Sequence, residues 1–327
     1  MKRSIALLLL GLAVTTAAAS DETTLDIRIS AAVDLYQYVR TQAELEQPEV
    51  HESYLPAVEA ARRIDARLEG IFLGWGFLDR ELVGVELVED IVERFNELPE
   101  AFTLRSGREV ALRDEAIAFA AELAKVEGRF VQREWAGHRD LVEQARNGIE
   151  DHLIPKQQEA FGFMLDSLGI ADPGHSIPVY LVADAPDPGA FTYGRAGGGG
   201  LCFVGVRELQ DSMLHEIVLH EATHALDVAS DGKSVLEELR ERLDKAGVDR
   251  RNRLWRDVPH TIMFIQAGET IRRLIHPEHT HYGDGGYYDM VRKVADVELP
   301  LWKRHLDGEL GRKETLTQIV EAVSAGE

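Results

Sequence analysis

Apolar residues recur three and four positions apart through most of the first half of the chain. This spacing puts them on one face of a helix, and it is interrupted at turn-forming pairs such as Gln47-Pro48, Leu98-Pro99 and Ser106-Gly107. The helical stretches are LDIRISAAVDLYQYVRTQAEL, YLPAVEAARRIDARLEGIF, FLDRELVGVELVEDIVERFNEL, REVALRDEAIAFAAELAKVEGRF, WAGHRDLVEQARNGIEDHL and PKQQEAFGFMLDSLGI. The pattern predicts a helical N-terminal region over residues 20–172.

The pattern changes after Asp172-Pro173-Gly174. Residues 177–183 (IPVYLVA) and 201–207 (LCFVGVR) are short β-branched and apolar runs, which predict two strands. The segment between them, DAPDPGAFTYGRAGGGG, is rich in proline and glycine and predicts a loop. Helical spacing returns over 208–230, 233–246, 258–275 and, after a polar loop, 289–325. We therefore expect a mainly α (α+β) fold in which a helical half is followed by a region, 173–327, that contains a small β-sheet.

The first nineteen residues, MKRSIALLLLGLAVTTAAA, have the character of a signal peptide. Lys2 and Arg3 precede an apolar run, and small residues follow it. We expect cleavage near Ser20 and an exported protein, periplasmic or secreted, that has no membrane insertion after signal removal. An uncleaved anchor is the alternative.

The chain of 327 residues carries a formal charge of −21, with 57 acidic and 36 basic side chains. Such an excess of negative charge repels nucleic acid and anionic membranes, so we expect neither as a partner. The only cysteine, Cys202, cannot form an internal disulfide, and no base is evident beside it. We expect it to be a small buried apolar residue.

Residues 220–224 read His-Glu-Ala-Thr-His within the helical stretch 208–230. Side chains four residues apart lie above one another on a helix, so His220 and His224 are placed to bind one zinc ion. Glu221 points about 100° away from His220 and could act as a general base toward a zinc-activated water. Chance is the alternative in a chain with 12 histidines, but the surrounding apolar helix and the preceding strand favour a zinc site.

This motif resembles that of the zincin metallopeptidases, and of their gluzincin branch in particular. The resemblance implies a zincin-like catalytic region over residues 173–327, a peptide or protein substrate, and a glutamate on a later helix as the third zinc ligand. The metzincin continuation is absent, because Asp227 and Ser230 stand where glycine and histidine or aspartate would be required. The strand 201–207 corresponds to the edge strand along which zincin substrates pair.

Glu269 is the glutamate that we expect to complete the zinc site. It lies in a strongly apolar helix, whose start we assign to a cap at Asp257, and a carboxylate in such surroundings needs a partner. The alternative partner is Arg272 or Arg273, and Arg273 occupies a position where many gluzincins have an aspartate. Glu237 and Glu238 have the pattern of a solvated helix face and are not expected to bind zinc.

A donor to the oxyanion is expected in the segment HPEHTHYGDGGYYDM. Its GGYYDM resembles the Gly-Tyr-Tyr stretch of some helical gluzincins, so Tyr287 or Tyr288 are the first candidates, followed by His281. The histidines at 276, 279 and 281 could hold a second metal, although a polar surface loop is the commoner outcome. We expect His260 to be a capping or packing residue.

His215 and Glu216 precede the motif and nearly duplicate it. No histidine stands four residues after His215, so this copy cannot form the same pair. Taken together, the residues favour an exported zinc metallopeptidase with Zn²⁺ as cofactor. The alternatives are a metal-binding protein of the same fold without catalysis, and a helical envelope or scaffold protein.

Overall fold

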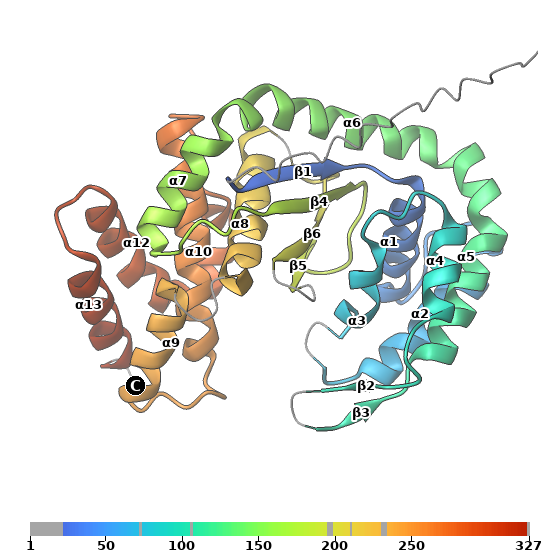
Figure 1. Ribbon diagram of the computed structural model, residues 1–327, viewed down its shortest axis with the longest axis horizontal. Coiled ribbons are helices and arrows are strands. Elements are labelled where there is room, and N and C mark those ends of the chain that lie inside the picture. Colours follow the sequence, from blue (N-terminus) through green and yellow to red (C-terminus); the bar gives the residue numbers. More distant parts are fainter. Residues whose placement is uncertain are drawn as a thin grey trace, which may run out of the picture.

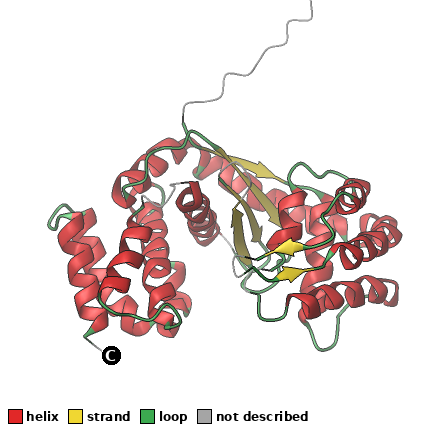
Figure 2. Ribbon diagram, turned by 60° about the horizontal axis from the view of Figure 1, so that its bottom comes forward, coloured by secondary structure: helices red, strands yellow, loops and turns green. Residues whose placement is uncertain are grey.

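The structure is a computed structural model and describes residues 22–71, 74–104, 107–194, 199–209, 211–229 and 234–325. The predicted signal peptide lies outside the described residues. A small mixed sheet lies at the centre of the molecule, with helices on both sides of it (Figures 1 and 2). The expected mainly α (α+β) fold class is confirmed. In the described part of the chain, no helix has the length and apolar character needed to cross a membrane.

The central sheet has four strands in the order β1-β4-β6-β5. Strands β1 (Thr24–Arg28), β4 (Ser176–Val182) and β6 (Gly200–Gly205) are parallel. Strand β5 (Ala190–Gly194) pairs antiparallel with β6 and is an edge of the sheet. The two predicted strands are therefore the two inner ones, which are buried on both faces.

Two expectations about strands are wrong. Residues 24–28, expected to belong to a helix, form the edge strand β1, and Ala190–Gly194, expected to be a loop, forms β5. The run 201–207 is consequently not an edge strand, because β6 lies between β4 and β5. Only one residue of β1 and two of β5 are buried, so these strands give a weaker apolar signal than the almost fully buried inner strands.

One hydrophobic core lies between the sheet and the helices of the first half. Its helices are α1 (Ala31–Glu44), α2 (Leu55–Leu68), α3 (Gly76–Asp79), α4 (Val88–Asn96) and α5 (Arg113–Arg133), with a small hairpin of β2 (Phe102–Thr103) and β3 (Glu109–Val110) beside them. From the sheet it receives Tyr180, Val182, Leu201 and Phe203. The alternate residues of the same two strands face the other way, as the pleat requires.

A second core lies on the opposite face of the sheet, against Val179, Leu181, Cys202 and Val204. Its helices are α6 (Trp135–His152), α7 (Gln157–Leu168), α8 (Asp211–Ala229), α9 (Val235–Lys245), α10 (Arg253–Leu274), α11 (Tyr287–Met290), α12 (Arg292–Leu306) and α13 (Arg312–Ser324). Because α6 and α7 contribute to this core, the two cores do not divide the chain at residue 172.

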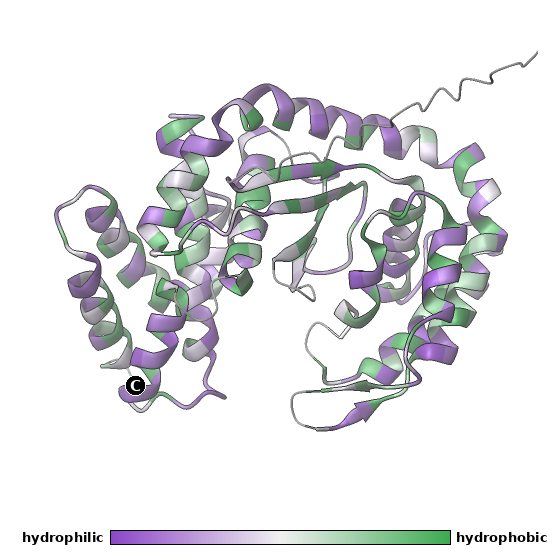
Figure 3. Cartoon of the chain, in the orientation of Figure 1, coloured by the Kyte–Doolittle hydropathy of each residue, from purple (hydrophilic) through white to green (hydrophobic). Residues whose placement is uncertain are grey.

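Helix α6 runs across the molecule from one helical group to the other (Figure 1). It is mostly hydrophilic in Figure 3, and only His138, Val142, Ala145 and Ile149 are buried, at helical spacing. His138 Nδ1 lies 2.6 Å from the buried carboxylate of Asp34 on α1. The other oxygen of this carboxylate accepts from the backbone of Ala183 at 2.6 Å, so Asp34 ties α1, α6 and the end of β4 together.

Candidate metal site

Helix α8 carries the His-Glu-x-x-His motif and packs directly on the sheet. At the contact, a Cβ added to Gly200 of β6 would lie 2.5 Å from the Cβ of Ala225, so only glycine allows this approach. His220 and His224 both face the neighbouring helix, α10. Their Nε2 atoms lie 3.2 Å apart. Two nitrogens on a tetrahedral zinc ion are separated by roughly 3.3 Å, so the predicted pair has ligand geometry.

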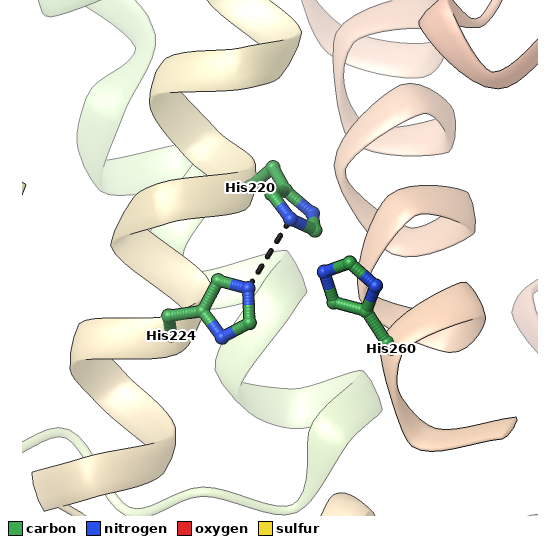
Figure 4. Close-up of side chains that lie close together, drawn as sticks. All are labelled: His220, His224 and His260. Atoms are coloured by element: carbon green, nitrogen blue, oxygen red, sulfur yellow. Dashed lines mark hydrogen bonds between the residues drawn. The ribbon is translucent and has the colours of Figure 1, made fainter. Parts of the chain in front are cut away.

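A third imidazole completes the group, and it belongs to His260 on α10. One ligand nitrogen from each of His220, His224 and His260 lies within 4.8 Å of the others, and the three could hold a metal ion. The ring centroids are 4.8, 5.0 and 5.3 Å apart. Three imidazoles on one zinc ion require roughly 5 Å, because each ring centre lies about 3 Å from the ion. In Figure 4 the three rings face one another across the gap between α8 and α10.

The three imidazoles are held in their neutral form. Burial lowers the pKa of His220 well below its ordinary value, and the neighbouring His224 and His260 lower it further. Burial likewise lowers the pKa of His224 to about 3 and of His260 to about 4. A metal ion binds the neutral imidazole, so at neutral pH the three lone pairs do not have to be freed from a proton.

Neighbouring groups fix the orientation of the rings. His220 stacks on Phe264 with centroids 3.7 Å apart, and its Nδ1 is buried without a hydrogen-bond partner. The Nδ1 of His260 lies 3.0 Å from the hydroxyl of Tyr287, which is also 3.3 Å from the hydroxyl of Thr261. With Nδ1 engaged in this way, Nε2 of His260 is the nitrogen left for a metal, and such second contacts raise metal affinity.

Glu221 follows His220 on α8 and lies against strand β5. The hydroxyl of Thr192 donates to its Oε2 at 2.6 Å. The carboxyl group is buried, and this burial raises its pKa to about 7, although the Thr192 hydrogen bond acts in the opposite direction. A group of this pKa exchanges protons readily near neutrality, as a general base must.

Glu269, expected as the third ligand, is not part of this group. It lies nine residues after His260 on the same helix, roughly 13 Å along the axis. Its buried carboxylate is bound by Arg272 at 2.6 Å and Arg273 at 2.9 Å, with Lys303 at 3.4 Å. Burial acts to raise the pKa of Glu269, but hydrogen bonds from His281 and the two arginines outweigh it and hold the pKa well below its usual range. The structure therefore supports the alternative partner, arginine.

The predicted oxyanion donors occupy two different places. Tyr287 is at the metal site, where its hydroxyl contacts His260. Tyr288 and His281 lie together near Glu269: the His281 Nδ1 is 3.2 Å from the Tyr288 hydroxyl, and its Nε2 is 3.2 Å from Glu269 Oε1. Gly268 leaves the space that the His281 ring fills. Of the three candidates, only Tyr287 reaches the histidine group.

The three histidines considered for a second metal each contact a different partner, although the rings of His279 and His281 lie 6.1 Å apart between centroids. His276 contacts His215, His279 contacts Glu216 at 2.6 Å, and His281 contacts Glu269. Glu216 is buried and also accepts from the backbone of Tyr282. These contacts hold the segment between α10 and α11 against α8 and α10.

His260 is the candidate metal ligand that the sequence prediction missed. It was expected to cap or pack because the helix was thought to begin near Asp257, but α10 begins at Arg253 with Asn252 as its cap. His260 is thus two turns inside the helix. Its spacing of four from Phe264, on the face that meets α8, was the signal available in the sequence.

No family model, curated protein or solved structure matches the chain. The site must therefore be interpreted from its own residues.

Proposed function

We propose that the protein is an exported zinc metallopeptidase in which His220, His224 and His260 bind the zinc ion and Glu221 is the general base. The observation that carries the proposal is the meeting of three neutral imidazoles from two helices, with the buried Glu221 between the two ligands of α8 in the sequence. Three protein ligands leave the fourth position of a tetrahedral zinc ion open, which is typical of catalytic rather than structural sites.

Zinc is favoured by the chemistry of the ligands. Imidazole nitrogen suits zinc and neighbouring transition metals, whereas calcium and magnesium prefer oxygen. A zinc ion here would supply an activated water and polarise a carbonyl group. The third histidine departs from the gluzincin pattern, so the resemblance extends to the His-Glu-x-x-His helix and not to the complete ligand set.

The chain's own residues would carry the proton. Glu221 would accept it from the attacking water and deliver it to the amine of the departing product. Thr192 holds one oxygen of Glu221, which keeps the carboxyl in a fixed orientation. Tyr287, with its hydroxyl on His260, supports a ligand rather than the oxyanion.

A peptide substrate is supported by strand β5. It is an edge of the sheet, and the same strand carries Thr192, whose hydroxyl contacts Glu221. An extended peptide that paired with this edge would run past the general base. In the sequence analysis this role, the edge strand that pairs with substrate, was assigned to residues 201–207.

Two experiments separate the proposal from a binding or scaffold protein. Zinc analysis of the purified protein should give a stoichiometric ion, which a scaffold would lack. Hydrolysis of an unbiased peptide library should be lost in Glu221→Gln although its zinc content is retained. Glu241→Gln on the exposed face of α9 is the matched control and should retain hydrolysis. Zinc retention without any hydrolysis in the wild type would favour the non-catalytic metal-binding protein.

Export is part of the same proposal, and it rests on the N-terminal sequence. The N-terminus of protein recovered from cells should begin near Ser20. Recovery of an intact N-terminus at Met1 from the cytoplasm would contradict it.

A further inference from the structure

A second group of histidines lies on another side of α8. His152 is the last residue of α6, His215 is on α8, and His276 follows the end of α10. Together with Asp211 they line a cavity of about 340 Å³. His215 is five residues before His220, roughly 140° around the helix, so this cavity is separate from the metal site described above.

Two of the three ring pairs are spaced as ligands of one ion require. Their centroids are 5.1 Å apart for His215 and His276, 5.4 Å for His152 and His276, and 6.0 Å for His152 and His215. A shared zinc ion requires roughly 5 Å. The Nδ1 of His215 and the Nε2 of His276 lie 3.0 Å apart in nearly coplanar rings, so at present they share one proton in a hydrogen bond.

His215 lies between the backbone of α6 and the ring of His276. Its side chain is buried, the backbone of Gly148 interacts with it, and its Nδ1 is the nitrogen that faces His276. Burial, followed by the neighbouring His276 and His152, lowers the pKa of His215 to about 4, and burial also lowers the pKa of His276.

The charges around the cavity also suit a cation. Asp211 is exposed at its rim, with a left-handed backbone (φ 48°) that costs energy for a residue other than glycine. Its negative charge acts on both His215 and His276. Arg207, which also lines the cavity, is neutralised by Asp184 at 2.5 Å. His152 is exposed, so an ion can reach the group from solvent.

We propose that His152, His215 and His276, with Asp211, form a second binding site for a divalent transition-metal ion such as Zn²⁺. The ion would bind between His215 Nδ1 and His276 Nε2, and the proton of their hydrogen bond would move through solvent to the other nitrogen of the same ring. A small rotation of His152 would bring in the third nitrogen. In the part of the chain that the structure describes, only His220, His224 and His260 have three ligand atoms within 4.8 Å of one another. The second site is therefore less preorganised and binds more weakly than the first.

The second site would join three elements of the fold. An ion held there links the end of α6 to α8 and to the segment that follows α10. That segment leads to Tyr287, which supports His260. Binding would stabilise the folded chain in proportion to the free ion concentration, because the unfolded chain does not assemble these ligands.

The test uses the full chain with the first site removed by His224→Ala. Titration of this variant with Zn²⁺, followed by calorimetry, should show one bound equivalent. Adding the exposed substitution His152→Ala should weaken this binding at least tenfold, and adding His276→Gln should do the same. The matched control is His175→Ala, an exposed histidine far from the cavity in sequence, which should leave the affinity unchanged. Circular dichroism of each variant establishes that it is folded.

The proposal is overturned if the folded His224→Ala variant binds no Zn²⁺, or if the His152→Ala and His175→Ala additions weaken binding equally. If His224→Ala does not fold, the same titration is made on the wild type. Two Zn²⁺ equivalents that fall to one in His152→Ala support the second site. A single Zn²⁺ equivalent that is still bound in His152→Ala excludes it. A wild-type protein whose only equivalent is lost in His152→Ala but kept in His224→Ala would support this site and refute the proposed peptidase.

Discussion

Substituting Tyr287 by phenylalanine tests the role that the structure gives to this residue. The change removes the hydroxyl that lies 3.0 Å from His260 Nδ1, while the ring can keep its packing on Phe264, 4.3 Å away between centroids. Loss of a second contact to a metal ligand typically weakens metal binding 10- to 100-fold. Burial raises the pKa of Tyr287 to about 12, so its hydroxyl is a neutral partner. A neutral hydrogen bond contributes about 0.5–1.5 kcal/mol. The expected loss of zinc affinity is therefore at the lower end of that 10- to 100-fold range, about tenfold.

The assay is a zinc titration in competition with a chromogenic chelator at pH 7. Tyr288→Phe is the matched control, because its hydroxyl contacts His281 and not the histidine group. We expect Tyr287→Phe to weaken zinc binding about tenfold and Tyr288→Phe to leave it within twofold of the wild type. Unchanged zinc affinity in Tyr287→Phe, or equal weakening in both variants, would refute the assignment of Tyr287 as a support for His260.

Three further substitutions test the surroundings of the site. Glu269→Gln leaves two arginines and a lysine around a neutral amide, and should lower the free energy of unfolding by about 2 kcal/mol at pH 7, less than for a fully buried pair because the arginines are partly exposed. Since the folded-state pKa of Glu269 is lowered, this difference should shrink below pH about 4, and zinc content should not change; loss of zinc would restore Glu269 as a ligand. Glu298 is buried without a hydrogen-bond partner for either oxygen, and burial raises its pKa well above the ordinary value. It therefore destabilises the protein as pH rises above about 4, so Glu298→Gln should raise the melting temperature at pH 8 but not at pH 4; equal effects at both values would contradict the buried charge. Gly200→Ala forces a Cβ against Ala225 and should cost about 1–3 kcal/mol in urea unfolding, whereas Gly128→Ala on α5, with no atom within 4 Å, should be neutral or stabilising; a tolerated Gly200→Ala would mean that α8 can shift.

The main elements of the fold could be predicted because their signals are local. Long helices with one apolar face and the two inner strands, which are apolar on both faces, depend on residues next to one another in the chain. Strands β1 and β5 could not be predicted in this way. The partner of Thr24 is Ser176, about 150 residues away, and β5 is a short strand in a segment rich in proline and glycine.

The same distinction explains the outcome at the site. His220 and His224 are one turn apart, and their meeting follows from helix geometry alone. His260 joins them only because α10 packs on α8, which is a property of the tertiary structure. For Glu269, the inference that a buried carboxylate needs a partner was sound, but the arginines three and four residues later on the same helix supply it. A partner within one helical turn should be weighed before a distant metal.

X-ray absorption at the zinc edge on the purified wild-type protein is the most direct test of the central claim, with the His152→Ala variant used to exclude the second group. For the ion that remains in His152→Ala, the account predicts three imidazole nitrogens and one further light ligand at about 2.0 Å, and loss of one imidazole when His260→Ala is added. An ion whose ligands are unchanged in His260→Ala, or a folded protein that binds no zinc, would contradict it.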